Sequence, residues 1–154
     1  MKPDPQIDNE KKGPRPRVLL IAGPTASGKS ALALELAKKQ ASVIINADSA
    51  QVYRDLQILS ARPSEDEMED IPHKLYGYID GAEACSAARW AQDAKRAIDA
   101  AHQHDILPIL VGGTGLYVRT LLDGISPIPE INPEIRNQIR ELETLEAYQA
   151  LSDE

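Results

Sequence analysis

The sequence predicts an α/β fold in which helices flank a parallel sheet. Three short apolar runs, Val18–Ala22, Val43–Ile45 and Ile106–Val111, alternate with longer segments rich in alanine and leucine. Continuous apolar runs are typical of strands buried on both faces, and strands that alternate with helical segments usually pair in parallel. The first and third runs lead directly into glycines, as strands do where a ligand approaches the sheet. We therefore expect all three strands to be buried on both faces.

Three helices are expected around these strands. One runs from about Gly28 to Lys39, another from Ala84 to about His104, and a third from roughly Glu134 to Leu151. One face of the second helix is apolar and carries Ala87, Trp90, Ala91, Ala94, Ile98 and Ala101. Residues 53–82 are irregular, and we expect a further strand near Leu75–Ile79.

Composition divides the 154 residues into three parts. Residues 1–17 are polar, rich in proline and net +2, and are expected to form a flexible tail. Residues 18–125, net −4, form the core. Residues 126–154, net −5, form the start of a helical insert after a proline-rich link. The overall charge of −7 argues against sequence-independent binding of nucleic acid, which needs a broad basic surface.

The cysteine count and the lengths of the apolar runs indicate where in the cell the protein is expected. Cys85 is the single cysteine, so the chain has no internal disulfide. No apolar run approaches the roughly 18 residues of a membrane span, and the N-terminus lacks a signal-peptide pattern. We expect a monomer in the cytoplasm with no membrane contact.

A phosphate-binding loop follows the first strand. The segment GPTASGKS fits G-x-x-x-x-G-K-[ST] and lies between an expected strand and an expected helix, the context that supports the motif. Its backbone N–H groups and the helix N-terminus attract phosphate, the lysine adds charge, and the last hydroxyl is placed to bind Mg²⁺. The motif predicts a P-loop NTPase-like sheet. The expected phosphate-binding residues are Gly23, Pro24, Thr25, Ala26, Ser27, Gly28, Lys29 and Ser30.

Asp48 is the acid nearest to the phosphate end of the sheet. A P-loop NTPase normally has an aspartate that holds Mg²⁺, but the third strand leads into Gly112–Gly115 without a carboxylate. Asp48, which follows the second strand, could bind Mg²⁺, act as a general base, or form an Asx turn. Within the second glycine segment, the Thr114 hydroxyl could bind a substrate or cap the next helix.

Three segments together resemble the tRNA dimethylallyltransferases, also called tRNA isopentenyltransferases. They are GPTASGKS at Gly23–Ser30, ADSAQVYR at Ala47–Arg54 and PILVGGTGLYVRTLLDGI at Pro108–Ile125. The weaker IPHKL at Ile71–Leu75 lies between them. The resemblance covers about residues 17–140, and this combination of motifs is far more specific than the phosphate loop alone.

The resemblance implies transfer of a dimethylallyl group from dimethylallyl diphosphate to N6 of adenine 37, beside the anticodon of tRNA, with release of pyrophosphate. It assigns the diphosphate to the loop Gly23–Ser30, with Lys29 and, through Mg²⁺, Ser30 neutralising its charge. It makes Asp48 and Thr114 the catalytic residues, Asp48 as the acceptor of the N6 proton. The implied tRNA-binding residues are Asp48, Ser49, Ala50, Gln51, Thr114 and Arg136.

Other functions remain open at this point. They are an adenylate dimethylallyltransferase, a small-molecule P-loop kinase and a non-catalytic module that binds diphosphate. The onset of a helical insert favours tRNA over free nucleotide, and the arginine-rich lid of a kinase is not seen. Members of the resembled family continue well beyond residue 154, so we expect an N-terminal fragment with weak or no transfer activity by itself.

Overall fold

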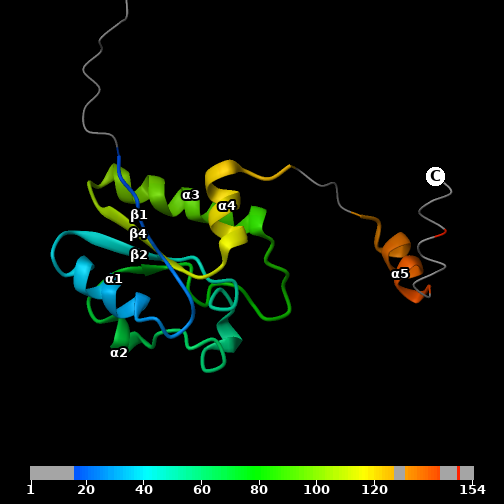
Figure 1. Ribbon diagram of the computed structural model, residues 1–154, viewed down its shortest axis with the longest axis horizontal. Helices are drawn as coiled ribbons and strands as arrows, with labels where there is room; N and C mark the ends of the chain where they lie inside the picture. The colour runs from blue at the N-terminus through cyan, green and yellow to red at the C-terminus, as the bar shows by residue number, and fades with distance from the viewer. Residues whose placement is uncertain (1–15, 127–130, 143–148, 150–154) are drawn as a thin grey trace, which may run out of the picture. The chain divides into compact units, whose positions relative to one another are not determined.

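A computed structural model describes residues 16–126, 131–142 and 149 (Figure 1). Four strands pair in parallel in the order β1-β4-β2-β3. The strands are β1 Leu19–Ala22, β2 Ser42–Asn46, β3 His73–Lys74 and β4 Leu107–Gly112. The helices are α1 Lys29–Ala37, the 3₁₀ turn η1 Arg54–Leu56, α2 Glu65–Met68, α3 Ala87–Gln103, α4 Gly115–Asp123 and α5 Pro133–Glu141. The predicted α/β class, a parallel sheet with flanking helices, is confirmed.

Helices cover both faces of the sheet (Figure 1). Successive side chains of a strand point to opposite faces, so Ile44 of β2 packs with α1 while Val43 and Ile45 pack with α3. On the first face, Ala33 and Ala37 of α1 bring the helix close to the sheet because their side chains are small. The core therefore has two layers, one on each side of the central strands β4 and β2.

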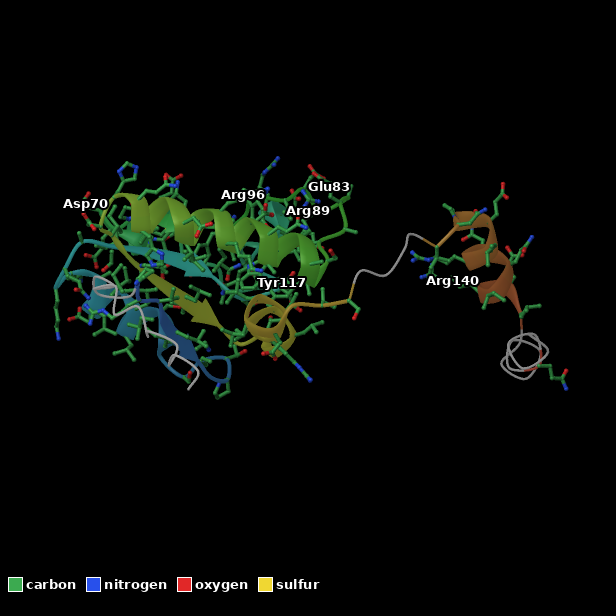
Figure 2. The ribbon with its side chains drawn as sticks, turned by 90° about the horizontal axis from the view of Figure 1, so that it is seen from above. Asp70, Glu83, Arg89, Arg96, Tyr117 and Arg140 are labelled. Atoms are coloured by element: carbon green, nitrogen blue, oxygen red, sulfur yellow. The ribbon has the colours of Figure 1, made fainter. Side chains whose placement is uncertain are left out.

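The second face is organised around Trp90 of α3. The indole is fully buried, and it stacks on Tyr117 of α4 (labelled in Figure 2) with ring centroids 4.6 Å apart. The α3 helix begins at Ala87, later than predicted, because the Ser86 hydroxyl caps it by accepting a hydrogen bond from Arg89 N. Among the described residues, no helix is long and apolar enough to cross a membrane.

β1 differs from the sequence prediction in its burial. The strand was expected to be buried on both faces, but it lies at the edge of the sheet and pairs, within the described strands, with β4 alone. Leu19 and Ile21 pack on the α1 side, whereas Leu20, on the opposite side, is 40% exposed. The expectation was wrong because an apolar run does not tell whether a strand is central or at an edge.

The strand expected near Leu75–Ile79 is also displaced. β3 consists of His73 and Lys74, which lie beside Ile44 and Ile45 of β2. Leu75 has φ 64°, a left-handed conformation that ends the strand. An isolated parallel bridge between Tyr53 and Ile79 is the remaining ladder contact in this region.

The residues after Gly124 form a second compact unit, Ile125–Glu154, which is described here by itself. In it, α5 begins at Pro133 with the Asn132 side chain as its cap. The helix predicted to reach Leu151 instead ends at Glu141, because Leu142 has an extended backbone with ψ 143°. Leu145 and Leu151, like the expected tail over residues 1–15, lie outside the described residues.

Gly112 allows the ends of β4 and β2 to approach. A Cβ atom on this glycine would lie 2.2 Å from the backbone of Ala47, whereas one on Gly115 would meet no atom within 4 Å. We expect G112A to lower the free energy of unfolding by about 1–3 kcal/mol, because backbone must move to admit the methyl group. The matched variant G115A, in the first turn of α4, should leave stability unchanged or raise it by up to about 1 kcal/mol. Urea titration of both variants checks this, and equal effects would contradict it.

Candidate functional site

The first glycine loop connects β1 to α1. Gly28 caps α1 with φ 82°, and Ala26 also has a positive φ of 60°. These left-handed residues curl the chain at the start of the helix, where the dipole and free N–H groups favour an anion. Lys29 Nζ donates a hydrogen bond across the loop to the Pro24 carbonyl. The loop thus has the form of a phosphate cradle, with its lysine folded over it.

A cavity of about 390 Å³ opens between this loop and the ends of the two central strands. Lys29 and Ser30 line it from the loop, and Asp48, Ala50 and Gln51 line it from the segment that follows β2. The full lining is Thr25, Ala26, Ser27, Gly28, Lys29, Ser30, Ala31, Asp48, Ala50, Gln51, Leu59, Ser60, Ala61, Val111 and Gly112. Most of the predicted phosphate residues therefore share one space with the predicted proton acceptor.

Asp48 forms the turn that was one of its expected roles. Its Oδ1 atom accepts a hydrogen bond from Ala50 N at 2.9 Å, which is an Asx turn. Among the described residues, no group donates a hydrogen bond to its Oδ2 atom. The turn and a chemical role are therefore compatible, because one oxygen fixes the side chain and the other remains available to a ligand.

Of the two roles considered for the Thr114 hydroxyl, the structure contradicts the helix cap, and substrate binding stays a prediction. Thr114 is the N-cap residue of α4, but its side chain makes no cap hydrogen bond. Instead Oγ1 accepts a hydrogen bond from Ser49 N at 2.9 Å and lies 3.3 Å from Ser49 Oγ. These bonds connect the second glycine loop to the segment that carries Asp48. Thr114 also lines a separate, largely apolar cavity of about 310 Å³ with Arg119 and Leu122.

Some predicted residues lie outside the 390 Å³ cavity. Gly23 and Pro24 belong to the loop but do not line the cavity, and Ser49 is turned to Thr114. Arg136 is exposed on α5 in the second unit. Its predicted contact with tRNA stays a prediction.

Two tyrosines near Asp48 keep their protons at neutral pH. Burial raises the pKa of Tyr76 well above its ordinary value, and the nearby charge of Asp48 adds to the effect. Burial is also the main cause that raises the pKa of Tyr117, followed by its hydrogen bond to Cys85. Neither phenol can therefore supply a base at neutral pH. Asp48 is the one carboxylate among the described residues that line the cavity, which makes it the candidate base.

With this geometry in place, the chain can be compared with known proteins. The family model of IPP transferase matches residues 51–154, more than half of the chain. The chain belongs to the IPP transferase family. The matched range begins after β2, so the first glycine loop and Asp48 lie outside it, and it includes Gln51, the second glycine loop and α5.

Curated relatives in the IPP transferase family are longer than this chain. The tRNA dimethylallyltransferase of Erythrobacter litoralis is 62% identical over 147 residues, which cover 92% of this chain and 46% of the relative. The tRNA dimethylallyltransferase of Zymomonas mobilis is 56% identical over 147 residues, which cover 96% of this chain and 46% of the relative. The chain thus spans about half the length of the curated relatives it matches.

Solved structures confirm the fold as P-loop-like. A eukaryotic dimethylallyltransferase acting on tRNA matches with a TM-score of 0.71 and 32% identity, over 82% of this chain and 32% of that protein. The full-length tRNA isopentenylpyrophosphate transferase of Bacillus halodurans matches with a TM-score of 0.71 and 34% identity, over 90% of this chain and 46% of that protein. The resemblance stated from the motifs is therefore correct.

Sequence reasoning missed the third wall of the cavity, which is made by Leu59, Ser60 and Ala61. Gln51 holds this loop in place, because its Nε2 donates to the carbonyl oxygens of Ser60 at 3.1 Å and of Ala61 at 3.3 Å. Leu59 is 85% exposed at the cavity rim. The adjacent apolar residues Ile58 and Leu59 in an irregular segment were the signal in the sequence, but a loop that folds back on the chain carries no periodicity that would reveal its position.

The donor atoms around the cavity suit Mg²⁺. This ion prefers hard oxygen ligands, and it usually binds one or two protein oxygens together with phosphate and water. The Ser30 hydroxyl and the Asp48 carboxylate both line the cavity. No cluster of three or more His, Cys, Asp or Glu side chains that could hold a metal ion occurs in the parts of the chain that the structure describes.

Proposed function

We propose that this chain carries the diphosphate-binding and proton-accepting part of a tRNA dimethylallyltransferase. The donor is dimethylallyl diphosphate and the acceptor is N6 of adenine 37 in the anticodon loop of tRNA. One observation carries the proposal: Lys29, Ser30 and Asp48 line the same cavity, so a cradle for a leaving diphosphate faces a carboxylate. The match to relatives named tRNA dimethylallyltransferase supports the choice of substrates.

The reaction fits these residues. The N6 lone pair attacks C1 of the allylic chain, the C–N bond forms, and the C1–O bond breaks so that pyrophosphate leaves with the electron pair. Charge develops on the leaving oxygens, where the loop N–H groups and Lys29 stabilise it more in the transition state than in the ground state. The proton lost from N6 passes to Asp48.

Partners and location follow as part of the same proposal. A bound Mg²⁺, held by the Ser30 hydroxyl, would supply further neutralisation of the diphosphate. We propose that Ser49, Ala50 and Gln51 contact the tRNA beside Asp48, with Thr114 holding Ser49 in place, and that Arg136 contributes a separate contact. We also propose that the protein acts as a monomer in the cytoplasm.

The test measures the products directly. Two proteins are compared. One is the 154-residue chain, and the other, the extended chain, adds the part of the Erythrobacter litoralis relative that lies beyond the match. Each is incubated with dimethylallyl diphosphate and an anticodon stem-loop. Mass spectrometry should show one added dimethylallyl group on the RNA with the extended chain, and little or none with the 154-residue chain. Calorimetry should show tighter binding of dimethylallyl diphosphate than of ATP.

Each alternative has its own outcome. Modification of free AMP in place of the stem-loop would identify an adenylate dimethylallyltransferase. Phosphoryl transfer from ATP would identify a kinase. Binding of pyrophosphate without transfer by either form would leave a non-catalytic module, and each of these three results would overturn the proposal.

A further inference from the structure

Asn46 is a buried polar residue two positions before Asp48. It ends β2, and none of its surface is exposed. Its Oδ1 atom accepts a hydrogen bond from Asp48 N at 2.9 Å. Its Nδ2 atom donates to the Asp48 carbonyl at 2.9 Å and to the Leu75 carbonyl at 3.0 Å. Both amide protons and the amide oxygen are therefore used, as a buried amide requires.

Two of these three bonds grip the backbone of a single residue. Asp48 has its N–H and its C=O held by the same side chain, an arrangement that we call the Asn46 clasp. Rotation about φ or ψ of Asp48 would break at least one of the two bonds. The clasp therefore fixes the direction in which the Asp48 carboxylate leaves the chain, and the Asx turn to Ala50 N fixes the side chain itself.

Asn46 is itself anchored in the rigid core. Its carbonyl accepts a hydrogen bond from Trp90 Nε1 at 2.9 Å, and the next peptide is tied to β4 by the bond from Ala47 N to the Val111 carbonyl at 2.8 Å. The clasp thus connects the carboxylate to the stacked Trp90–Tyr117 pair. Packed interiors deform little, so the position of the carboxylate is set by the core rather than by an exposed loop.

We propose that Asn46 is a positioning residue for proton acceptance by Asp48. The proposal rests on the proposed function, because it assigns Asn46 a role in that reaction. Asn46 is absent from the cavity lining, so it acts through Asp48 and not on the substrate. A base must lie within hydrogen-bond reach of the proton it accepts, and a displacement of about 1 Å costs on the order of 100-fold in rate.

The first test compares variants of the extended chain. N46A should lower kcat by about 100-fold, with KM for dimethylallyl diphosphate and the Kd for pyrophosphate changed by less than about twofold. N46S should recover part of the rate, because a serine hydroxyl can accept the same i+2 N–H bond. The matched control is S42A, which removes a buried polar group at the other end of β2 and should leave kcat unchanged.

A double-mutant cycle separates positioning from general loss of structure. If Asn46 acts through the carboxylate, N46A in the D48N background should cost little more than D48N alone. If the losses in kcat caused by N46A and D48N multiplied in the double variant, the inference would be overturned. An N46A enzyme with normal kcat would overturn it as well. If D48N alone left the rate unchanged, the proposed function would fail instead, so the two failures are distinct.

A measurement without turnover tests the clasp itself. In the 154-residue chain, N46A should speed hydrogen exchange at the Asp48 amide by at least about tenfold, while S42A should not. Unchanged protection of the Asp48 amide in N46A would overturn the inference whatever the activity of the extended chain.

Discussion

Replacing Lys29 with methionine weakens the binding of pyrophosphate by about 10- to 100-fold, the cost of losing a hydrogen bond between charged groups. Lys29 is the lysine that lines the cavity, and its ammonium already lies over the loop, on the Pro24 carbonyl. In the extended chain, kcat for transfer should fall by about 100- to 1000-fold, because charge on the leaving diphosphate grows as the C1–O bond breaks. Isothermal calorimetry with the 154-residue chain and single-turnover transfer with the extended chain measure the two effects.

The matched control for this prediction is K39M. Lys39 follows the same helix at its other end and lies outside the cavity. The two variants lose the same charge, so a general electrostatic effect would weaken binding equally in both. Equal losses would mean that the loop does not hold the diphosphate.

Replacing Asp48 with asparagine has the second large effect. Asparagine keeps an oxygen for the bond from Ala50 N and leaves the Asn46 clasp intact, so the turn should survive. The proton acceptor is lost, and we expect kcat to fall by about 100- to 10000-fold. Affinity for pyrophosphate should remain within about twofold, because the diphosphate is held by the loop.

D99N controls for the change in net charge, since Asp99 is exposed on α3 away from the cavity. It should leave both transfer and binding unchanged. If D48N weakened pyrophosphate binding as strongly as it slowed transfer, Asp48 would be acting through the metal site, the role that the sequence left open.

Sequence patterns predicted the structure well where a feature is formed by one contiguous segment. The glycine loop, its helix and Lys29 are contiguous, so spacing alone predicted a phosphate cradle. The apolar face of α3 was predicted for the same reason: helical periodicity shows which residues turn to the core, and Trp90, Ala91 and Ala94 are buried. The combination of motifs also indicated the family.

Patterns failed where the outcome depends on a partner distant in the sequence. The apolar run of β1 predicted burial on both faces, but the strand lies at the sheet edge, a position that depends on the order in which strands pair. β3 ends at Lys74 because Leu75 adopts a left-handed conformation, which the neighbouring residues in the sequence do not predict. Thr114 looked like a helix cap, yet its hydroxyl binds Ser49, 65 positions away.

The sequence by itself determined the fold class, the position of the first glycine loop and the family, because each depends on contiguous residues with a fixed spacing. The tertiary structure decided how the chemistry is assembled. It placed Asp48 and the first glycine loop around one cavity, bonded the Thr114 hydroxyl to Ser49 rather than to the backbone of α4, and bonded the buried Asn46 side chain to the backbone of Asp48 and of Leu75. The bonds from Asn46 to Leu75 and from Ser49 to Thr114 join segments 29 and 65 positions apart, which meet only when the sheet has formed, and no local propensity encodes them.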